Sequence, residues 1–386
     1  MLTTLAIANY RSLRELIVPL ERLNLVVGAN GSGKSNLYRA LRLLAESAQT
    51  GIVPALAREG GLGSALWAGP ETISRAMRRG EVPVQGGPRR ESVRLCLGFA
   101  SDDLGYAVDL GYPTPSLSAF ALDPQIKREV IWSGPFLRAA SILVDRNGSM
   151  VRVRDGRSWR VAHQHLNLFE SIFGQIADPQ SAPEVLSLRE TIRGWRFYDH
   201  FRSDAESPAR LPQLATRTPV LSHDGRDVAA AWQTILELGD ARALDAAVAD
   251  AFPGAEVKVT NVDGRFLLHF SQHGLLRSLS AAELSDGTLR YLLWIAALHT
   301  PRPPPLMVLN EPETSLHPDL LLPLARLIAD AATRTQVWVV SHAARLIAAL
   351  EDQPHCHTIR LEKELSQTIV SGQGMLDQPA WHWPER

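Results

Sequence analysis

The residues whose spacing most clearly indicates chemistry lie near the start of the chain. Residues 28–35 read Gly-Ala-Asn-Gly-Ser-Gly-Lys-Ser and fit the pattern G-x-x-x-x-G-K-[ST] of a phosphate-binding loop. Glycines let the backbone approach phosphate oxygens closely, so that backbone N–H groups and the start of the next helix can bind them. Lys34 adds a positive charge near the β and γ oxygens, and the Ser35 hydroxyl is expected to bind Mg²⁺. We predict nucleotide contacts from Gly28, Asn30, Gly31, Ser32, Gly33, Lys34, Ser35 and Asn36.

Two apolar segments end in polar residues that could act on a bound phosphate. Residues 305–311 read Pro-Leu-Met-Val-Leu-Asn-Glu, which is typical of a buried strand that brings Asn310 and Glu311 to the carboxyl edge of a sheet. Glu311 is suited to orient and polarise an attacking water beside a γ-phosphate, although it could instead cap the next helix. Residues 339–342 place His342 at the end of another strand, where a histidine is often only a satisfied polar residue.

A serine-glycine turn supplies a second candidate anion site. Residues 284–288 read Leu-Ser-Asp-Gly-Thr and precede a long helical pattern. Ser285 and the free amides of this turn could bind an anion. On its own the pentapeptide would indicate only a helix N-cap.

These groups need a scaffold that brings them together. Short apolar runs at residues 2–8 and 23–27 indicate strands, and residues 35–48 have apolar positions at helical spacing. The last third alternates between helix and strand, which predicts a parallel sheet with helices on its faces. The expected helices are 285–299, 318–331 and 342–350, and the expected strands are 306–309 and 336–340.

The middle of the chain shows two other sequence patterns. Alternating runs at residues 93–97 and 151–154 predict antiparallel hairpins, supported by Asn-Gly and Asp-Gly turns. Helical patterns dominate residues 166–252, and strands return at 257–270. Residues after Gln373 are expected to form a loose tail.

As a set, these motifs resemble the ABC-type ATPases of the SMC/RecF/OLD-like branch, specifically its AAA ATPases. The relevant matches are Ile-Ala-Asn-Tyr-Arg-Ser at 7–12, the turn at 284–288, Leu-Asn-Glu-Pro-Glu-Thr-Ser-Leu-His-Pro at 309–318, and His342. The resemblance implies an α/β P-loop NTPase fold: an ABC-type head with a mixed or parallel central sheet flanked by helices, an antiparallel β subdomain and a helical insertion lobe. In this single head of residues 1–386, the expected parts are a nucleotide-binding core (1–90 and 255–386), the β subdomain (91–165) and the helical lobe (166–254).

The resemblance also implies roles for individual residues. Residues 28–35 correspond to the Walker A loop, Ser285 and Gly287 to the signature turn, and Glu311 to the catalytic glutamate. His342 corresponds to the switch histidine that contacts the γ-phosphate, and His317 falls at the D-loop position. The Q-loop glutamine is assigned to Gln175, in the sequence Phe-Gly-Gln-Ile.

In this family two ATP molecules lie between two heads, each bound by one subunit's Walker A loop and the other subunit's signature turn. The resemblance therefore implies a homodimer that closes on ATP and reopens on hydrolysis, with ATP and Mg²⁺ as cofactors. The candidate metal ligands are Ser35, Asn310 and Gln175.

Asn310 stands where most ABC enzymes have the Walker B aspartate. An amide can hydrogen-bond a magnesium-bound water but brings no charge to the ion. A unit charge at about 4 Å, with an effective dielectric constant of ~20, contributes roughly 4 kcal/mol before desolvation. We therefore expect weak Mg²⁺ affinity and slow turnover. The alternative is a nucleotide-gated binding module in which hydrolysis is vestigial.

Composition limits the remaining choices. The chain has 386 residues, 40 Lys+Arg against 41 Asp+Glu, and a net charge of -1, which excludes a histone-like polycation. No apolar run approaches the ~18 residues of a membrane span, and two cysteines in a long chain indicate a reducing compartment. We expect a cytoplasmic protein without a membrane partner. His355-Cys356-His357 is interpreted as part of a strand rather than as a metal site.

The expected pathway rests on the resemblance: DNA repair, chromosome maintenance or defence against foreign DNA. Residues 193–202 interleave arginines with aromatic residues, which could bind DNA or could simply pack a core while the arginines pair with nearby acids. The segment after His342 is too short for the nuclease module of OLD-like relatives, so a nuclease would be a separate partner. A transporter ATPase subunit is the rival interpretation, disfavoured by the long insertion between Lys34 and Ser285.

Overall fold

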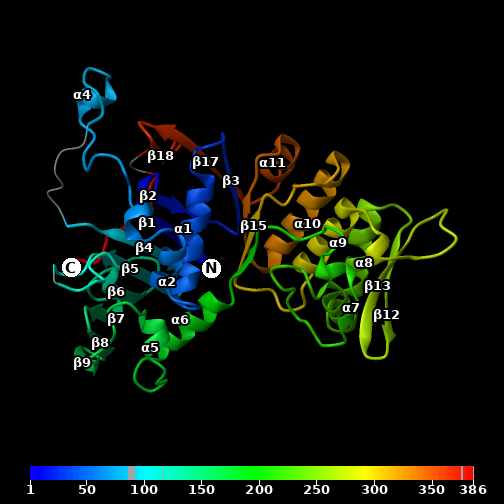
Figure 1. Cartoon of the computed structure of the whole chain (residues 1–386), viewed down its shortest axis with the longest axis horizontal. Helices are drawn as coiled ribbons and strands as arrows, with labels where there is room; N and C mark the ends of the chain where they lie inside the picture. The colour runs from blue at the N-terminus through cyan, green and yellow to red at the C-terminus, as the bar shows by residue number, and fades with distance from the viewer. Residues whose placement is uncertain (86–91, 116, 375–376, 386) are drawn as a thin grey trace. The chain divides into compact units, whose positions relative to one another are not determined.

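The computed structural model describes residues 1–85, 92–115, 117–374 and 377–385. The chain forms two compact units (Figure 1). The first unit comprises Met1–Glu21, Val27–Gly194 and Ile359–Arg386, and the second comprises Arg22–Val26 and Trp195–Thr358.

An antiparallel sheet forms the frame of the first unit. Its strand order is β2-β1-β4-β5-β6-β7-β8-β9. The strands are β1 (Leu2–Tyr10), β2 (Leu13–Pro19), β4 (Leu95–Ser101), β5 (Leu104–Gly111), β6 (Gln125–Ser133), β7 (Ile142–Asn147), β8 (Met150–Asp155) and β9 (Ser158–His163). The predicted hairpins are confirmed, and β1 and β2 extend the same sheet at its N-terminal side.

Helices and a second hairpin complete the first unit. Helix α1 (Lys34–Ser47) packs on β1 and β4 and buries Leu37, Leu41 and Leu44, which share one helical face. The other helices are α2 (Ile52–Arg58), α3 (Leu62–Ala65), α4 (Arg75–Arg78), α5 (Ile172–Gln175) and α6 (Pro183–Arg193). Strand β17 (Cys356–Glu364), which begins in the second unit, pairs within the first unit with β18 (Gln367–Val370). The predicted strand at Cys356 is confirmed, and the described residues contain no group of three or more His, Cys, Asp or Glu side chains that could hold a metal ion.

A fully buried ion pair ties the sheet of the first unit to α5. Arg146 and Glu129 are both 0% exposed, and Arg146 Nη1 lies 2.6 Å from Glu129 Oε2. Glu129 also accepts hydrogen bonds from the Ser171 hydroxyl (2.6 Å) and the Ile172 amide (3.0 Å). Because these groups are removed from water, each depends on its partners in the cluster.

The expectation of a loose tail is wrong for the described C-terminal residues. The Trp381 ring lies 5.6 Å from the Trp132 ring and 5.3 Å from the Trp383 ring, with near-perpendicular planes. Gly98 leaves room for it, since a Cβ there would lie 2.7 Å from Trp381 Cζ2. Large apolar rings outweigh the cost of ordering a short segment, an outcome that composition did not reveal.

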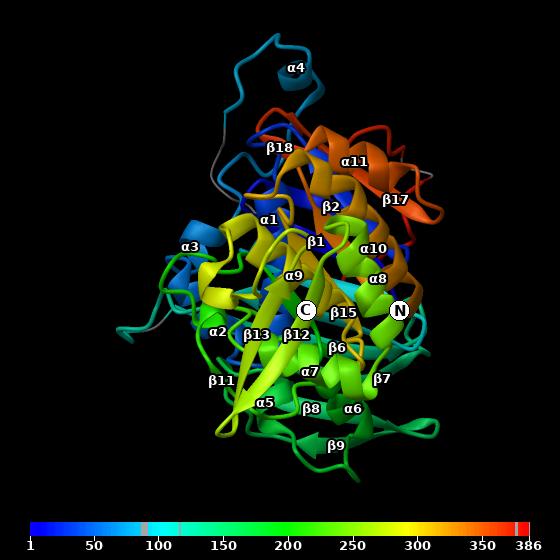
Figure 2. The same ribbon diagram turned by 90° about the vertical axis from the view of Figure 1, so that its right-hand side faces the viewer.

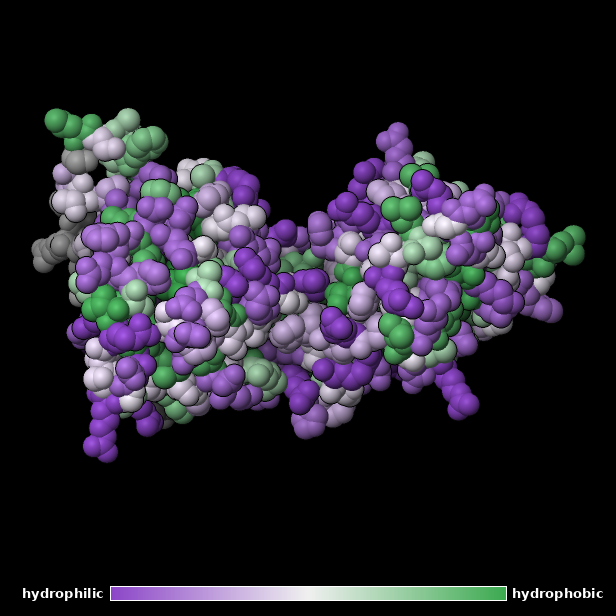
Figure 3. All heavy atoms as spheres, turned by 90° about the horizontal axis from the view of Figure 1, so that it is seen from below, coloured by the Kyte–Doolittle hydropathy of each residue, from purple (hydrophilic) through white to green (hydrophobic). Residues whose placement is uncertain are grey.

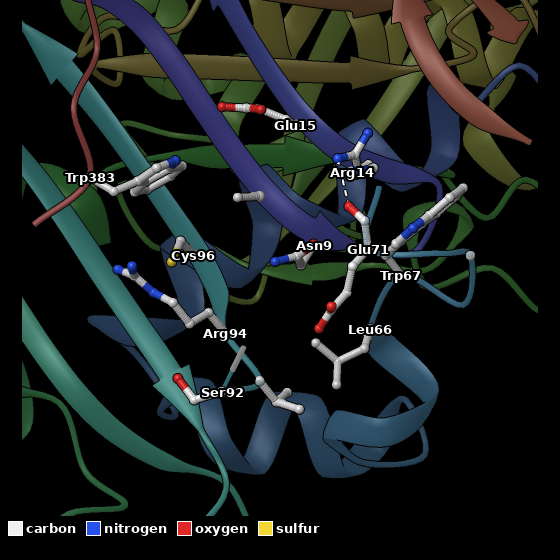
Figure 4. A pocket seen from close by; sticks show the side chains of 13 residues that line it. Asn9, Arg14, Glu15, Leu66, Trp67, Glu71, Ser92, Arg94, Cys96 and Trp383 are labelled. Carbon is white, nitrogen blue, oxygen red and sulfur yellow. Dashed lines mark hydrogen bonds between the residues drawn. The ribbon is translucent and has the colours of Figure 1, made fainter. Parts of the chain in front are cut away.

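Trp383 also lines a cavity of about 270 Å³ in the first unit, beside β1 and β4 (Figure 4). Its basic side chains are already engaged. Arg14 Nη2 donates to the Glu71 carbonyl oxygen at 2.7 Å, and Arg94 pairs with Asp109 at 2.9 Å. The cavity contains no residue of the phosphate-binding loop.

Parallel strands form the centre of the second unit, in the order β10-β15-β16-β3. They are β10 (Arg196–Tyr198), β15 (Leu306–Asn310), β16 (Gln336–Val340) and β3 (Leu23–Gly28), of which residues 23–26 belong to this unit. Every residue of β16 is buried, as expected for a central parallel strand. The predicted strands at 306–309 and 336–340 are confirmed.

Helices and a small antiparallel sheet surround these strands (Figures 1 and 2). The helices are α7 (Val228–Leu238), α8 (Ala241–Ala251), α9 (Asp286–Leu298), α10 (Leu321–Arg334) and α11 (Ala344–Glu351), with 3-10 turns η1 (Pro208–Arg210), η2 (Ala281–Glu283) and η3 (Pro318–Leu320). The small sheet contains β11 (Gln213–Leu214), β12 (Glu256–Val262), β13 (Arg265–Ser271) and β14 (Leu279–Ser280). Figure 2 shows β12 and β13 as a long hairpin, and α7 and α8 contact it.

Residues 166–252 are less helical than expected. Strand β10 lies within them and pairs in parallel with β15, so part of this segment belongs to the parallel sheet. The aromatic residues nearby are core residues: Trp195, Tyr198 and Phe201 are at most 2% exposed. These three rings offer no surface on which bases could stack, which favours the core interpretation for them.

On the face shown in Figure 3, apolar side chains are scattered among polar ones. Within the described residues, no helix combines the length and apolar character needed to cross a lipid bilayer.

Candidate nucleotide-binding site

The phosphate-binding loop, residues 28–35, connects β3 to α1 in the first unit. Its glycines Gly31 and Gly33 have positive φ values of 79° and 113°, and Gly33 is the N-cap of α1. The Lys34 ammonium donates to the carbonyl oxygens of Gly28 (2.6 Å) and Ala29 (3.2 Å). No acidic residue occupies the first turn of α1, so its free amides and the helix dipole favour an anion.

Two of the glycines are required by close packing against the β17–β18 hairpin. A Cβ on Gly28 would lie 2.4 Å from the Leu361 carbonyl oxygen. A Cβ on Gly33 would lie 2.1 Å from Thr368 Oγ1. The β17–β18 hairpin therefore packs directly against the loop. Any larger residue at Gly28 or Gly33 would push the loop and the hairpin apart.

A directed chain of hydrogen bonds holds the loop. Thr368 Oγ1 donates to the Ser32 carbonyl oxygen at 2.8 Å, which uses its hydrogen. The Ser12 hydroxyl, 2.7 Å away, must therefore donate to Thr368. Asn36 Nδ2 in turn donates to Ser12 Oγ at 2.8 Å. Asn36, expected as a nucleotide contact, thus binds Ser12, and no sequence motif indicates the role of Thr368.

A second cavity of about 460 Å³ is lined in part by Ser12, whose hydroxyl belongs to the hydrogen-bond chain that holds the loop. Arg11, Trp67, Pro70 and Leu365 contribute to its wall. Arg11 has a φ of 49° and pairs with Glu59 at 2.8 Å. Its wall combines apolar and aromatic side chains with the Arg11 guanidinium, and such a lining suits a flat heterocyclic ring.

The second unit carries the other predicted residues, at the carboxyl edge of its parallel strands. Asn310 pairs with Val340, and Val340 pairs with Val26 of β3. The Glu311 amide donates to the Val340 carbonyl oxygen at 2.8 Å. The phosphate-binding loop begins only two residues after Val26 along the chain. Glu311 itself has a φ of 50°, a left-handed conformation that is strained for a residue with a Cβ.

Glu311 and His342 lie beside a buried carboxylate that sequence reasoning missed. His342 Nδ1 is 3.7 Å from Glu311 Oε1 and 3.5 Å from Glu313 Oε1. Glu313 Oε1 accepts hydrogen bonds from the Ser341 hydroxyl (2.7 Å) and the His342 amide (2.9 Å). Glu313 is 8% exposed, so it acts as an anchor between the two strand ends. The sequence Glu-Pro-Glu contained the signal, since a second acid after a strand end needs a partner.

The turn at residues 284–288 begins α9, with Ser285 as its N-cap. Ser285 Oγ accepts a hydrogen bond from the Thr288 amide at 3.2 Å. The Ser285 side chain is nevertheless exposed. A Cβ on Gly287 would lie 3.1 Å from the Ser315 carbonyl oxygen, so this turn packs against the turn that follows Glu311.

Two other candidates have local structural roles. His317 caps η3 by accepting a hydrogen bond from the Asp319 amide at 3.3 Å. Gln175 lies in α5 of the first unit, where its side chain accepts from the Asn167 amide (2.8 Å) and donates to the Glu170 carbonyl oxygen (3.0 Å). These bonds close the loop before α5 and give Gln175 a purpose that needs no metal.

Comparisons with known proteins identify the family of the chain. Residues 153–348 match the family described as "AAA domain, putative AbiEii toxin, Type IV TA system". The chain belongs to this AAA family. Residues 1–59 also match the AAA ATPase domain family. By these two matches the chain is an AAA-family ATPase, and its fold resembles that of an SMC head.

Solved structures that resemble the chain include SMC head domains. The SMC head bound to the C-winged helix domain of ScpA is 12% identical, with a TM-score of 0.51 over 97% of this chain and 98% of that chain. The SMC head with an extended coiled coil bound to the C-terminal domain of ScpA from Pyrococcus furiosus is 12% identical, with a TM-score of 0.48 over 96% of this chain and 95% of that chain. The SMC head domain from Thermotoga maritima is 12% identical, with a TM-score of 0.45 over 97% of this chain and 99% of that chain. Curated proteins gave no match. The mixed α/β P-loop fold expected of this AAA ATPase is confirmed.

Proposed function

We propose that this AAA ATPase hydrolyses ATP with Mg²⁺ and dimerises around the nucleotide. The observation that carries the proposal is the phosphate-binding loop, braced by Thr368 and followed by a helix without an acidic first turn. Its donors fit a polyphosphate: backbone amides, the Lys34 ammonium and the Ser35 hydroxyl. The cavity beside Arg11 and Trp67 would hold the base.

Glu311 would orient the attacking water, and His342 would hold the γ-phosphate. Glu311 is half-exposed, at 46%, so its carboxylate can reach solvent water. Glu313 keeps His342 beside it by binding the His342 backbone. Bound Mg²⁺ would neutralise charge on the phosphates, with Ser35 and Asn310 as its candidate ligands. Gln175 remains the sequence-based assignment for the Q-loop, although its local bonds favour a structural role.

The exposed signature turn supports dimerisation. Ser285 is exposed on the second unit, and its hydroxyl and the nearby backbone amides would contact an anion there, with the Asp286 carboxylate held by Arg210. In a homodimer this turn would meet the ATP bound to the partner's Lys34. The similar SMC heads are bound to ScpA, and that partner is known for those proteins only.

ATP turnover by Glu311→Gln tests the proposal. The variant should release no phosphate yet form a stable dimer with ATP, whereas Lys34→Ala should neither bind nor dimerise. Light scattering and phosphate release are measured on the same samples, with and without single- and double-stranded DNA. A Glu311→Gln protein that stays monomeric with saturating ATP contradicts the dimer, and unchanged phosphate release contradicts the role of Glu311.

Asn310 favours a second candidate, a nucleotide-gated binding module. Its amide supplies no charge to Mg²⁺, so ATP could hold the dimer closed with little hydrolysis. Tight ATP binding and dimerisation by the wild-type chain without phosphate release would support this function. A stimulated rate with DNA would instead support a cytoplasmic enzyme of repair, chromosome maintenance or defence, alone or with a separate nuclease.

A further inference from the structure

One face of α9 holds the turn that carries Glu311, defined here as residues 311–317. Positions 287, 290 and 294 have the i, i+3, i+7 spacing that places residues on one side of a helix. Each meets a different carbonyl oxygen of the turn: Gly287 packs on Ser315 O, Arg290 Nη1 donates to Thr314 O (2.7 Å) and Trp294 Nε1 donates to Pro312 O (3.0 Å). The helix that begins at the signature turn therefore fixes the backbone next to Glu311.

Arg290 is the polar centre of this contact. It is 5% exposed, and its Nη2 donates to the Phe201 carbonyl oxygen (3.0 Å) and to Ser203 Oγ (3.1 Å). Burial lowers the pKa of Arg290 from its usual value. Such a guanidinium costs free energy to bury and is retained where fixed acceptors surround it.

A second buried arginine holds the signature turn itself. Arg210 is 9% exposed. Its Nη1 donates to the Leu284 carbonyl oxygen at 2.7 Å, and its Nη2 lies 2.7 Å from Asp286 Oδ1. These two contacts flank Ser285 on both sides. Ser203 joins the two arginines, because its carbonyl oxygen accepts from Arg210 Nη2 at 2.7 Å while its hydroxyl accepts from Arg290.

We propose that these arginines are positioning residues for opposite halves of a composite site. Arg290 orients Glu311, which acts on the chain's own ATP, and Arg210 holds Ser285, which reaches the partner's ATP. This inference rests on the proposed dimer. It assigns each arginine to one of the two active sites that a single chain helps to build.

Mixed dimers separate the two tasks. A chain with Glu311→Gln, added in excess, supplies Ser285 to an otherwise intact hydrolysing chain, so each mixed dimer has one active site. Arg290→Met should slow phosphate release about tenfold or more when placed in the hydrolysing chain, and change it less than about twofold in the Gln chain. Arg210→Met should give the reverse pattern.

The affinity of each variant for ATP, measured on the monomer, should stay at the wild-type value, because neither arginine belongs to the phosphate-binding loop. Arg290→Lys, which keeps the charge but not the fork of donors, should restore part of the rate and guards against a folding defect. If both variants slow both arrangements equally, or neither variant slows either one, the inference is wrong. If wild-type and Gln chains form no ATP-dependent dimer, it is the proposed function that fails.

Discussion

Replacing Thr368 with valine tests whether the β17–β18 hairpin shapes the phosphate-binding loop. Valine keeps the methyl group of threonine and has a second methyl group in place of the hydroxyl. The change removes the bond to the Ser32 carbonyl oxygen (2.8 Å) and the contact with Ser12 Oγ (2.7 Å). Thr368 is 1% exposed, so water cannot readily replace the lost partner.

The expected cost follows from the number of polar groups left without a partner. The Ser32 carbonyl oxygen loses its donor and the Ser12 hydroxyl loses its acceptor. Each such loss costs about 1–3 kcal/mol. If about 2 kcal/mol of this falls on the loop conformation that binds phosphate, the affinity for ATP drops roughly 30-fold. The Asn36–Ser12 bond should weaken too, because the hydroxyls polarise one another along the chain.

Calorimetric titration of ATP into wild type, Thr368→Val and Thr368→Ser measures this effect. Thr368→Ser keeps the hydroxyl and should bind nearly as the wild type does, which controls for the lost methyl group. A Thr368→Val protein that melts at a lower temperature but binds ATP within about twofold of wild type would refute the reasoning. The hydrogen-bond chain would then contribute to fold stability alone.

Four further changes have expected outcomes. Arg146→Met should cost about 3–5 kcal/mol in urea unfolding, because it leaves the Glu129 carboxylate buried without its cation, while Glu129→Gln together with Arg146→Met should recover part of it. Asn310→Asp should raise Mg²⁺ affinity and turnover in a titration of Mg²⁺ against phosphate release, and unchanged values would exclude Asn310 as a metal ligand. Burial raises the pKa of Cys356 to about 11, so its alkylation by iodoacetamide should be slow at pH 8 and accelerate up to pH 11; fast labelling at pH 8 would contradict the burial. Trp381→Ala should lower the melting temperature and expose the tail to proteolysis, and a tail equally resistant in both proteins would show that the ring is not what holds it.

The sequence alone predicts those parts of the fold and of the candidate site that depend on neighbouring residues. The loop at residues 28–35, the strand before Glu311 and the N-cap at Ser285 each follow from neighbouring residues, because periodicity and capping act over a few positions. The predicted helices of the last third are confirmed for the same reason.

The missing parts of the site depend on residues far apart in the chain. Thr368 contacts Ser12 across 356 positions, and no local pattern marks either of them as a brace for the loop. Arg210 and Arg290 look like ordinary surface arginines until folding buries them among carbonyl oxygens. Strand β10 was missed because three residues are too few to show alternation.

The left-handed conformation of Glu311 explains why the site needs these distant supports. A residue with a Cβ at a φ of 50° carries about 1–3 kcal/mol of strain, and it persists only where surrounding contacts leave no alternative. Here the Glu311 amide is held by Val340, and the following turn is held by Glu313 and by α9. Because α9 also carries the signature turn, the same helix that would meet the partner's nucleotide constrains the strained residue. An arrangement of this kind makes the geometry of Glu311 depend on more than its own strand, and it gives Arg290 an effect on catalysis without contact with the substrate.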